Sequence, residues 1–328
     1  MRPFTSLTLA LISAFATSLT AQTVSTVPVG FNTITVNSGR LAALSFPFDN
    51  ITAFAGAVGS RTSSTITTTG IGAGSYATTA APFVVRFVTG ASTGRQFKVT
   101  AQSTDTLTLQ TNGVDLTTAT ANGDSFEILP IHTLASFFGA TADPNKPAII
   151  RNADSNLADN VLVRGSFGYL TYYNDGSKWL LVSGGSTPQN DVALPSDQGF
   201  LFQRRTGSNI TITVLGTVPH TNLKTDLPAN KTTIFPNRFP VDTTLTGLGL
   251  HTNPNWIKND DATLADNLLI RGTFGWNTYY VNAAGQWRLS GGGATDQGAT
   301  AVPLGISMLA VRRAGSLVTL DQPLPYTL

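Results

Sequence analysis

Two matching groups of polar residues are the strongest candidates for chemistry in this chain. Asp159 and Asp266 are each followed by an asparagine and, five residues after the aspartate, by an arginine, Arg164 or Arg271. An arginine can hold a carboxylate or phosphate through two parallel hydrogen bonds, so these groups could form two equivalent sites for an anionic ligand. The alternative, which we favour, is an Asx-turn leading into a strand, with an Asp–Arg bridge that anchors it.

Oxygen-rich runs, NADSNLADN and NDDATLADN, contain the same aspartates. Their candidate calcium ligands are Asp154, Asn156 and Asp159 in the first run and Asp260, Asp261 and Asp266 in the second. Both runs lack the glycine and the terminal bidentate glutamate of the familiar calcium loop. Calcium is therefore the one cofactor that these residues could hold, and we favour its absence.

Aromatic residues also recur at matching places. Trp179 and Trp287 correspond, and a tyrosine pair precedes each of them. They could form a platform that stacks on sugars, but aromatics at matched strand positions more often pack in a core or pair across strands, which we favour. The complete set of candidate ligand-binding residues is Asp159, Arg164, Trp179, Asp266, Arg271 and Trp287.

No catalytic residue is assigned by the sequence. It contains neither an HExxH nor a GxSxG motif, and Glu127 is its only glutamate. Glycoside hydrolysis needs two carboxylates about 5–9.5 Å apart, and nothing in the sequence selects such a pair. We therefore favour a non-enzymatic protein and keep a polysaccharide-active enzyme as the competing class.

The candidate residues lie in a segment that occurs twice. LADNVLVRGSFGYLTYY (157–173) and LADNLLIRGTFGWNTYY (264–280) are identical at 12 of 17 positions, which indicates a duplicated structural unit. Residues 59–130 have no counterpart in the second copy and contain short alternating runs typical of strands, so they are predicted to be an inserted β-module. The predicted organisation is a first unit of residues 22–58 and 131–217, the insert of residues 59–130, and a second unit of residues 218–328.

The composition favours strands, because good helix formers such as glutamate and lysine are scarce while threonine and glycine abound. The predicted fold is all-β: two tandem related β units, sandwich-like or barrel-like, with a small barrel-like module inserted in the first. Asp175-Gly176 predicts one hairpin, and residues 200–214 and 308–320 predict two more. We expect Arg204-Arg205 and Arg312-Arg313 to be solvated strand-edge charges, and residues 60–81 to be mobile.

The N-terminus is typical of a secretory signal peptide. Arg2 precedes an apolar stretch at residues 7–16, and small residues lead to a predicted cleavage after Ala21. No later stretch is long and apolar enough to span a membrane as a helix, so we expect no transmembrane segment in the mature chain. The formal net charge of +2 is spread without a basic stripe, so nucleic acid is not an expected partner. The chain has no cysteine, which excludes disulfides and thiolate chemistry.

The motifs VPVGF, LADNVLVRGSFG and LPSDQGFLFQRR, with the runs of the insert, resemble an uncharacterised family of exported, often multi-copy proteins from verrucomicrobial and related bacteria. The resemblance implies export and the two-unit layout but no activity. We expect an exported, non-enzymatic protein of the cell surface or periplasm with a structural, adhesive or binding role. The alternative is a secreted polysaccharide-binding or polysaccharide-active protein, and the expected partners are polysaccharides or other surface proteins.

Overall fold

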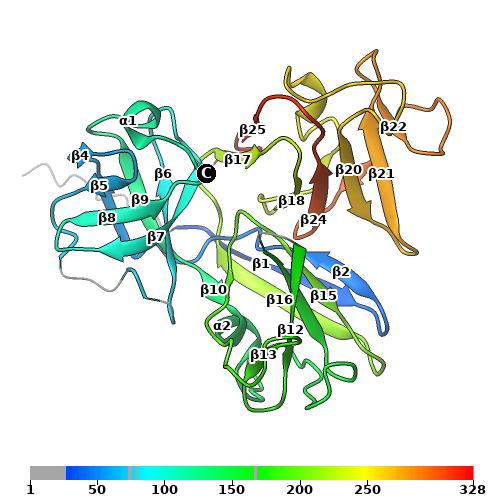
Figure 1. The fold of residues 1–328 in the computed structure, drawn as a ribbon, viewed down its shortest axis with the longest axis horizontal. Helices are drawn as coiled ribbons and strands as arrows, with labels where there is room; N and C mark the ends of the chain where they lie inside the picture. The colour runs from blue at the N-terminus through cyan, green and yellow to red at the C-terminus, as the bar shows by residue number, and fades with distance from the viewer. Residues whose placement is uncertain (1–26, 73–75, 79, 166–167, 328) are drawn as a thin grey trace, which may run out of the picture.

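The computed structural model describes residues 27–72, 76–78, 80–165 and 168–327, and it confirms the predicted all-β class (Figure 1). The expected signal peptide, residues 1–21, lies outside these ranges. Within them, no helix combines the length and the apolar character that crossing a membrane requires.

The first unit is a sandwich whose larger layer is a five-stranded antiparallel sheet. Its strands are, in spatial order, β13 (Trp179–Leu181), β12 (Gly168–Asn174), β11 (Asn160–Gly165), β15 (Phe200–Gln203) and β2 (Leu41–Leu44). The smaller layer is a ribbon of β1 (Val29–Val36) and β16 (Ile210–Thr217), accompanied by β10 (His132–Thr133), β14 (Ala193–Leu194) and the helix α2 (Leu134–Phe138). Because side chains alternate along strands, Val161 and Phe202 of the sheet meet Val36 and Ile212 of the ribbon in one apolar core.

The second unit repeats this topology strand for strand. Its sheet is β22 (Trp287–Leu289), β21 (Trp276–Val281), β20 (Asn267–Arg271), β24 (Ser307–Val311) and β18 (Thr232–Pro236). Its ribbon is β17 (Leu223–Leu227) with β25 (Val318–Gln322), and it also contains β19 (Thr243–Thr244), β23 (Ala301–Val302) and the 3-10 helix η1 (Leu250–Thr252). The register agrees as well, since Asn160 pairs with Tyr173 in the first unit and Asn267 with Tyr280 in the second. The two tandem units are therefore related in structure.

The insert forms a seven-stranded antiparallel sheet. Its order is β3 (Phe54–Ala57), β9 (Ser125–Pro130), β6 (Phe83–Phe87), β7 (Gln96–Gln102), β8 (Thr106–Gln110), β5 (Thr65–Thr67) and β4 (Ser60–Arg61), and the short helix α1 (Leu116–Ala119) follows β8.

The insert sheet curls into a barrel-like shape because of its connections. Its edge strands β3 and β4 are joined by only two residues, 58 and 59, whereas a flat sheet would hold them roughly 29 Å apart at about 4.8 Å per strand. Residues 60–81 were expected to be mobile, but 60–61 and 65–67 form β4 and β5, with Ile66 fully buried in the barrel core. The first strand, β3, lies just ahead of the predicted start at residue 59.

The two units pack through the outer faces of their five-stranded sheets. Leu162 and Leu201 of the first unit cluster with their equivalents, Leu269 and Leu309, of the second. An antiparallel bridge joins the end of β2 to the residue before β24. Because equivalent residues meet, the arrangement is pseudo-two-fold.

Only one of the three predicted hairpins is confirmed. The Asp175-Gly176 turn joins β12 to β13. The other two predictions are wrong, because β15 and β16, and likewise β24 and β25, belong to different layers. At the first of these corners Arg204 is buried, and its Nε donates a hydrogen bond to the carbonyl of Ser208 at 3.0 Å. The arginine thus closes a turn that carries the chain from the sheet to the ribbon.

Candidate functional site

Asp159 and Asp266 anchor the corners of the two units. Neither has exposed surface. Asp159 accepts hydrogen bonds from the guanidinium of Arg204 at 2.5 Å and from the backbone N–H groups of Arg205 and Ile150 at 2.8 Å. Asp266 has the three equivalent donors at 2.6–2.8 Å. A carboxylate surrounded by donors of the fold has no room for a ligand, so both aspartates anchor the fold, although through other arginines than the ones we expected.

The partners of these aspartates differ from the prediction. The anchoring arginines are Arg204 and Arg312, which are 4% and 3% exposed, and not Arg164 or Arg271. The expectation that both arginine pairs are solvated edge charges is therefore wrong for the first member of each pair. The physical reason is the strand alternation: one arginine of each pair points inward, where its charge needs a carboxylate.

Trp179 and Trp287 are core residues, as we favoured. They are 0% and 1% exposed, and the Trp179 indole donates a hydrogen bond to the carbonyl of Gly139 at 2.9 Å. Neither ring offers a face to a ligand at the surface, so the stacking platform does not include them.

The oxygen-rich runs form turns. Asp154 accepts a hydrogen bond from the backbone N–H of Asn156, and Asp261 accepts one from Thr263, which is the geometry of an Asx-turn. Among the residues that the structure describes, no three His, Cys, Asp or Glu side chains are grouped to hold a metal ion. Asp154 and Asp261 thus shape the turns that lead to β11 and β20.

Arg164 and Arg271 lie on the opposite face of their sheets from the anchoring corners. Arg164 stands over the ring of Tyr169, its cross-strand partner, at 5.6 Å, and Arg271 stands over Trp276 at 5.7 Å. The face concerned is the one that meets the other unit, because both aromatic rings pack against the cluster between the units. Each arginine therefore points along the interface.

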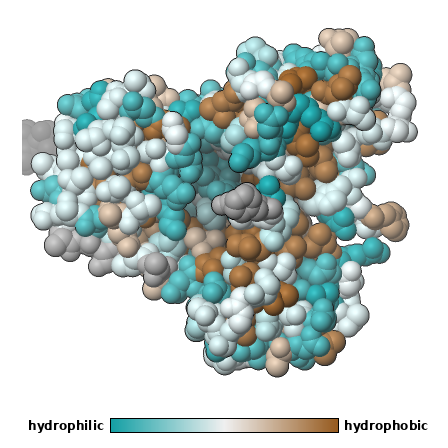
Figure 2. All heavy atoms as spheres, in the orientation of Figure 1, coloured by the Kyte–Doolittle hydropathy of each residue, from teal (hydrophilic) through white to brown (hydrophobic). Residues whose placement is uncertain are grey.

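Arg164 lines a cleft of about 550 Å³ that we call the junction cleft. One wall is the β11–β12 hairpin, another is β17 and β18 of the second unit, and the third is β7 with residues 111–114 of the insert. The surface is hollowed between the insert and the second unit (Figure 2). Its polar lining residues include Arg95, Gln96, Arg164, Asp197, Lys224, Thr225 and Asp226.

Of the basic side chains that line the junction cleft, Arg95 and Lys224 are paired with aspartates, whereas Arg164 forms no salt bridge among the described residues. Arg95 forms a salt bridge of 2.9 Å with Asp226, and Lys224 one of 3.2 Å with Asp321. Within the described part of the chain, Arg164 has no carboxylate in salt-bridge range and rests on Tyr169. An anion entering the cleft would meet a positive charge that no described group neutralises.

Uncharged polar groups of the junction cleft are also unpaired. Thr225 is 8% exposed, and its Oγ1 has no hydrogen-bond partner among the described residues. The same holds for Nε2 of Gln96, whose Oε1 accepts from Ser196. Burial raises the pKa of Asp197, against the opposing charge of Arg238, so this carboxyl is easier to protonate than usual. Buried polar groups without partners are rare in folded proteins, so this wall of the cleft is unusually polar.

A buried ionic cluster joins the insert to both units. Arg86 of β6 is 1% exposed and forms salt bridges with Asp49 and, at 2.9 Å, with Glu127. His220, which follows the first unit, lies 3.0 Å from the other oxygen of Glu127. Its hydrogen bond with Glu127 raises the pKa of His220, although burial opposes the shift. The cluster therefore ties the insert to the first unit and to the segment that leads into the second.

This cluster predicts a pH dependence of stability. Because its pKa is raised in the folded state, His220 stabilises the fold fully below its unfolded pKa of about 6.5, and this stabilisation is lost as pH rises through the folded pKa. The His220 side chain is 41% exposed, so solvent screening limits the effect to a few tenths of a kcal/mol. Urea unfolding of His220→Gln between about pH 6 and 8 should lack the wild-type decline. His251→Gln should keep it, and equal slopes for all three proteins would contradict the prediction.

Sequence reasoning selected Arg164 but missed Arg95, Gln96 and Thr225. The insert occurs once, so no repeat marks its residues, and Thr225 is one of many threonines in strands. The only signal for the cleft was the retention of an arginine in both copies of the hairpin.

Comparisons with protein-family models, with curated proteins and with solved structures find no match to this chain. The class of protein is thus defined by its own fold and cleft: a cysteine-free, all-β protein of two related sandwich units with an inserted β-module.

Proposed function

We propose that this chain is an exported, non-enzymatic binding protein whose junction cleft holds an acidic polysaccharide at the cell surface or in the periplasm. The single observation that carries the proposal is Arg164, which lines the junction cleft, stands over the Tyr169 ring and forms no salt bridge among the described residues. A guanidinium supported by an aromatic ring is well placed to take a carboxylate in a bidentate contact. Thr225 and Gln96 add neutral polar side chains to the lining of the cleft.

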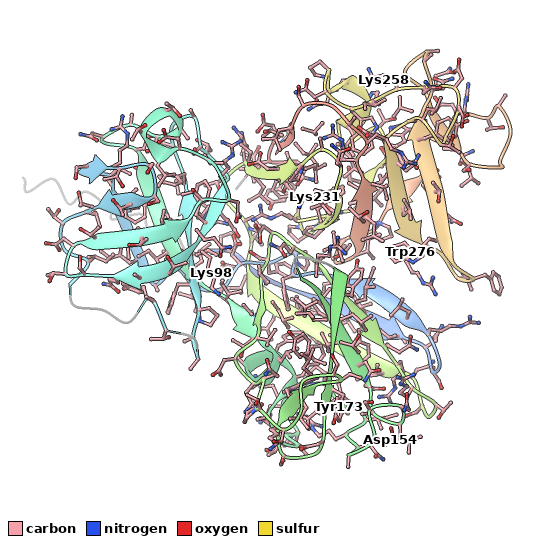
Figure 3. The ribbon with its side chains drawn as sticks, viewed as in Figure 1. Lys98, Asp154, Tyr173, Lys231, Lys258 and Trp276 are labelled. Atoms are coloured by element: carbon pink, nitrogen blue, oxygen red, sulfur yellow. The ribbon has the colours of Figure 1, made fainter. Side chains whose placement is uncertain are left out.

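Binding should depend on Arg164. Arg164→Ala should weaken the affinity for a polyuronate such as polygalacturonate at least about tenfold, because one charge-assisted contact contributes roughly 1.5–3 kcal/mol. The measurement is titration calorimetry, with neutral dextran as the ligand control. Lys258→Ala is the matched variant, since it removes one positive charge at the far end of the second unit (Figure 3). Unchanged polyuronate affinity in Arg164→Ala would refute the proposal.

Export has its own test. The full chain, expressed with its own leader in a Gram-negative host, should be recovered outside the cytoplasm with Gln22 as its N-terminal residue. Recovery from the cytoplasm with the leader intact would contradict this part of the proposal.

A second candidate function is hydrolysis of the bound polysaccharide. The cleft contains two carboxyl groups, Asp197 with a raised pKa and Asp226 in a salt bridge, and such a contrast is what an acid and its partner carboxylate require. Asp226 is held by both Arg95 and Thr319, which favours a structural role. Release of reducing ends from polyuronate that disappears in Asp197→Asn would favour the enzyme.

A further inference from the structure

The junction cleft has a pseudo-symmetric counterpart on the other side of the unit interface. This second groove, of about 220 Å³, lies between the β20–β21 hairpin and strands β1 and β2. Arg271 and Gly272 correspond to Arg164 and Gly165, and residues 41–43 of β2 correspond to residues 232–234 of β18. Residues 34, 35 and 37 likewise correspond to residues 225, 226 and 228. The duplication has thus produced two related grooves. Described residues of the insert line the junction cleft but not the second groove.

The second groove is basic, and an aromatic ring lies beside each of its two arginines. Arg271 stands over Trp276 at 5.7 Å while its Nε donates to the carbonyl of Leu41 at 3.3 Å. Arg40 stands 5.9 Å from the ring of Phe274, which is 91% exposed at the hairpin tip. Trp276 marks the end of the second sheet nearest to β2 (Figure 3). No carboxylate is among the described residues that line the second groove.

We propose that the second groove is a second binding site for acidic polysaccharide, so that each chain holds two polysaccharide segments and cross-links them. This inference rests on the proposed function of the junction cleft. Two arginines without a neighbouring carboxylate attract a polyanion, and an exposed ring beside them offers an apolar face on which a sugar can lie. The occupant needs to be extended, because the second groove is open along one side where the insert closes the first.

Bivalency would distinguish a cross-linking protein from a simple binder. Two sites on one rigid body raise the apparent affinity for a long polymer far above that of either site, provided that the polymer reaches both. A short oligomer that cannot reach both sites reports each of them separately. The two ligand lengths therefore separate site number from avidity.

The experiment is titration of the full chain with a trigalacturonate and, separately, with long polygalacturonate. The wild type should bind two trigalacturonates per chain, whereas Arg271→Ala and Arg164→Ala should each bind one, and the double variant none. Phe274→Ala, which changes only an exposed side chain, should weaken the second site about tenfold without changing the melting temperature. Wild-type protein should make long polymer turbid, and either single arginine variant should not.

The outcomes separate the two proposals. One trigalacturonate per chain, with binding lost in Arg164→Ala and unchanged in Arg271→Ala and Phe274→Ala, overturns the second site and leaves the junction cleft intact. If the wild type binds one trigalacturonate per chain and only Arg271→Ala abolishes this binding, the junction cleft is not a binding site. No binding of either ligand overturns both.

Discussion

Replacing Asp266 by alanine should lower the free energy of unfolding by about 3–5 kcal/mol, because the change leaves a buried arginine without its carboxylate. Arg312 is 3% exposed, and its Nε donates to Asp266 at 2.7 Å. The same carboxylate also accepts the backbone N–H groups of Ile257 and Arg313. The variant would leave these three donors without an acceptor, at the corner where the chain passes from the sheet to the ribbon. Equilibrium unfolding in urea measures the loss.

Two variants control this prediction. Asp191→Ala removes an exposed aspartate and should stay within about 0.5 kcal/mol of wild type. Asp266→Ala combined with Arg312→Met removes both charges, so it should recover part of the lost stability, since a buried ion pair can be exchanged for apolar groups at little cost. A loss below about 1 kcal/mol in Asp266→Ala would show that Asp266 does not anchor the corner.

The two-unit fold could be predicted because its signal is periodic and repeated. Side chains alternate along β11 and β20, so Val161 and Leu268 lie in the unit cores while Leu162 and Leu269 lie in the unit interface. The corners could not be predicted in the same way. A strand, a glycine turn and a second strand are also the signature of a hairpin, and only the inward arginine reveals that the second strand changes layer.

The candidate site was predictable only in part. Arg164 and Arg271 were selected because both copies retain them, but the same argument also selected Asp159 and Trp179, which serve folding. Both copies therefore retain the buried packing residues and also the arginines that we propose as ligand-binding residues, and the sequence pattern is the same for both kinds. Burial separates them: the aspartates and tryptophans are enclosed, while the arginines lie at the edges of the interface.

The insert explains how two copies of one groove come to differ. It covers the outer side of β17, where Arg95 meets Asp226 and Lys224 donates to the carbonyl of Ala91. The equivalent outer face of the first ribbon keeps Val29 and Phe31 exposed. The junction cleft and the second groove therefore differ because the insert lies beside only one of two otherwise related units.

The packing of the units predicts a second large effect, at Gly199. This glycine corresponds to Ser307, and both lie buried near the pseudo-two-fold axis, where the Ser307 hydroxyl donates to the carbonyl of Leu44 at 2.6 Å. A Cβ on Gly199 would overlap the Ser307 hydroxyl and lie 2.9 Å from that carbonyl oxygen. Gly199→Val should therefore force the units apart and cost about 3 kcal/mol in urea unfolding.

The matched variant for Gly199→Val is Gly275→Val, which places the same side chain at a hairpin tip with no atom within 4 Å and should cost less than about 0.5 kcal/mol. Adding Ser307→Gly to Gly199→Val should restore part of the stability, because it removes the overlapping side chain, although it also removes a hydrogen bond that contributes about 1 kcal/mol. A coupling between the two positions therefore measures the contact across the axis. If Gly199→Val has the same free energy of unfolding as wild type, the equivalent segments of the two units do not meet. The interface between the units, along which both grooves lie, would then be wrong.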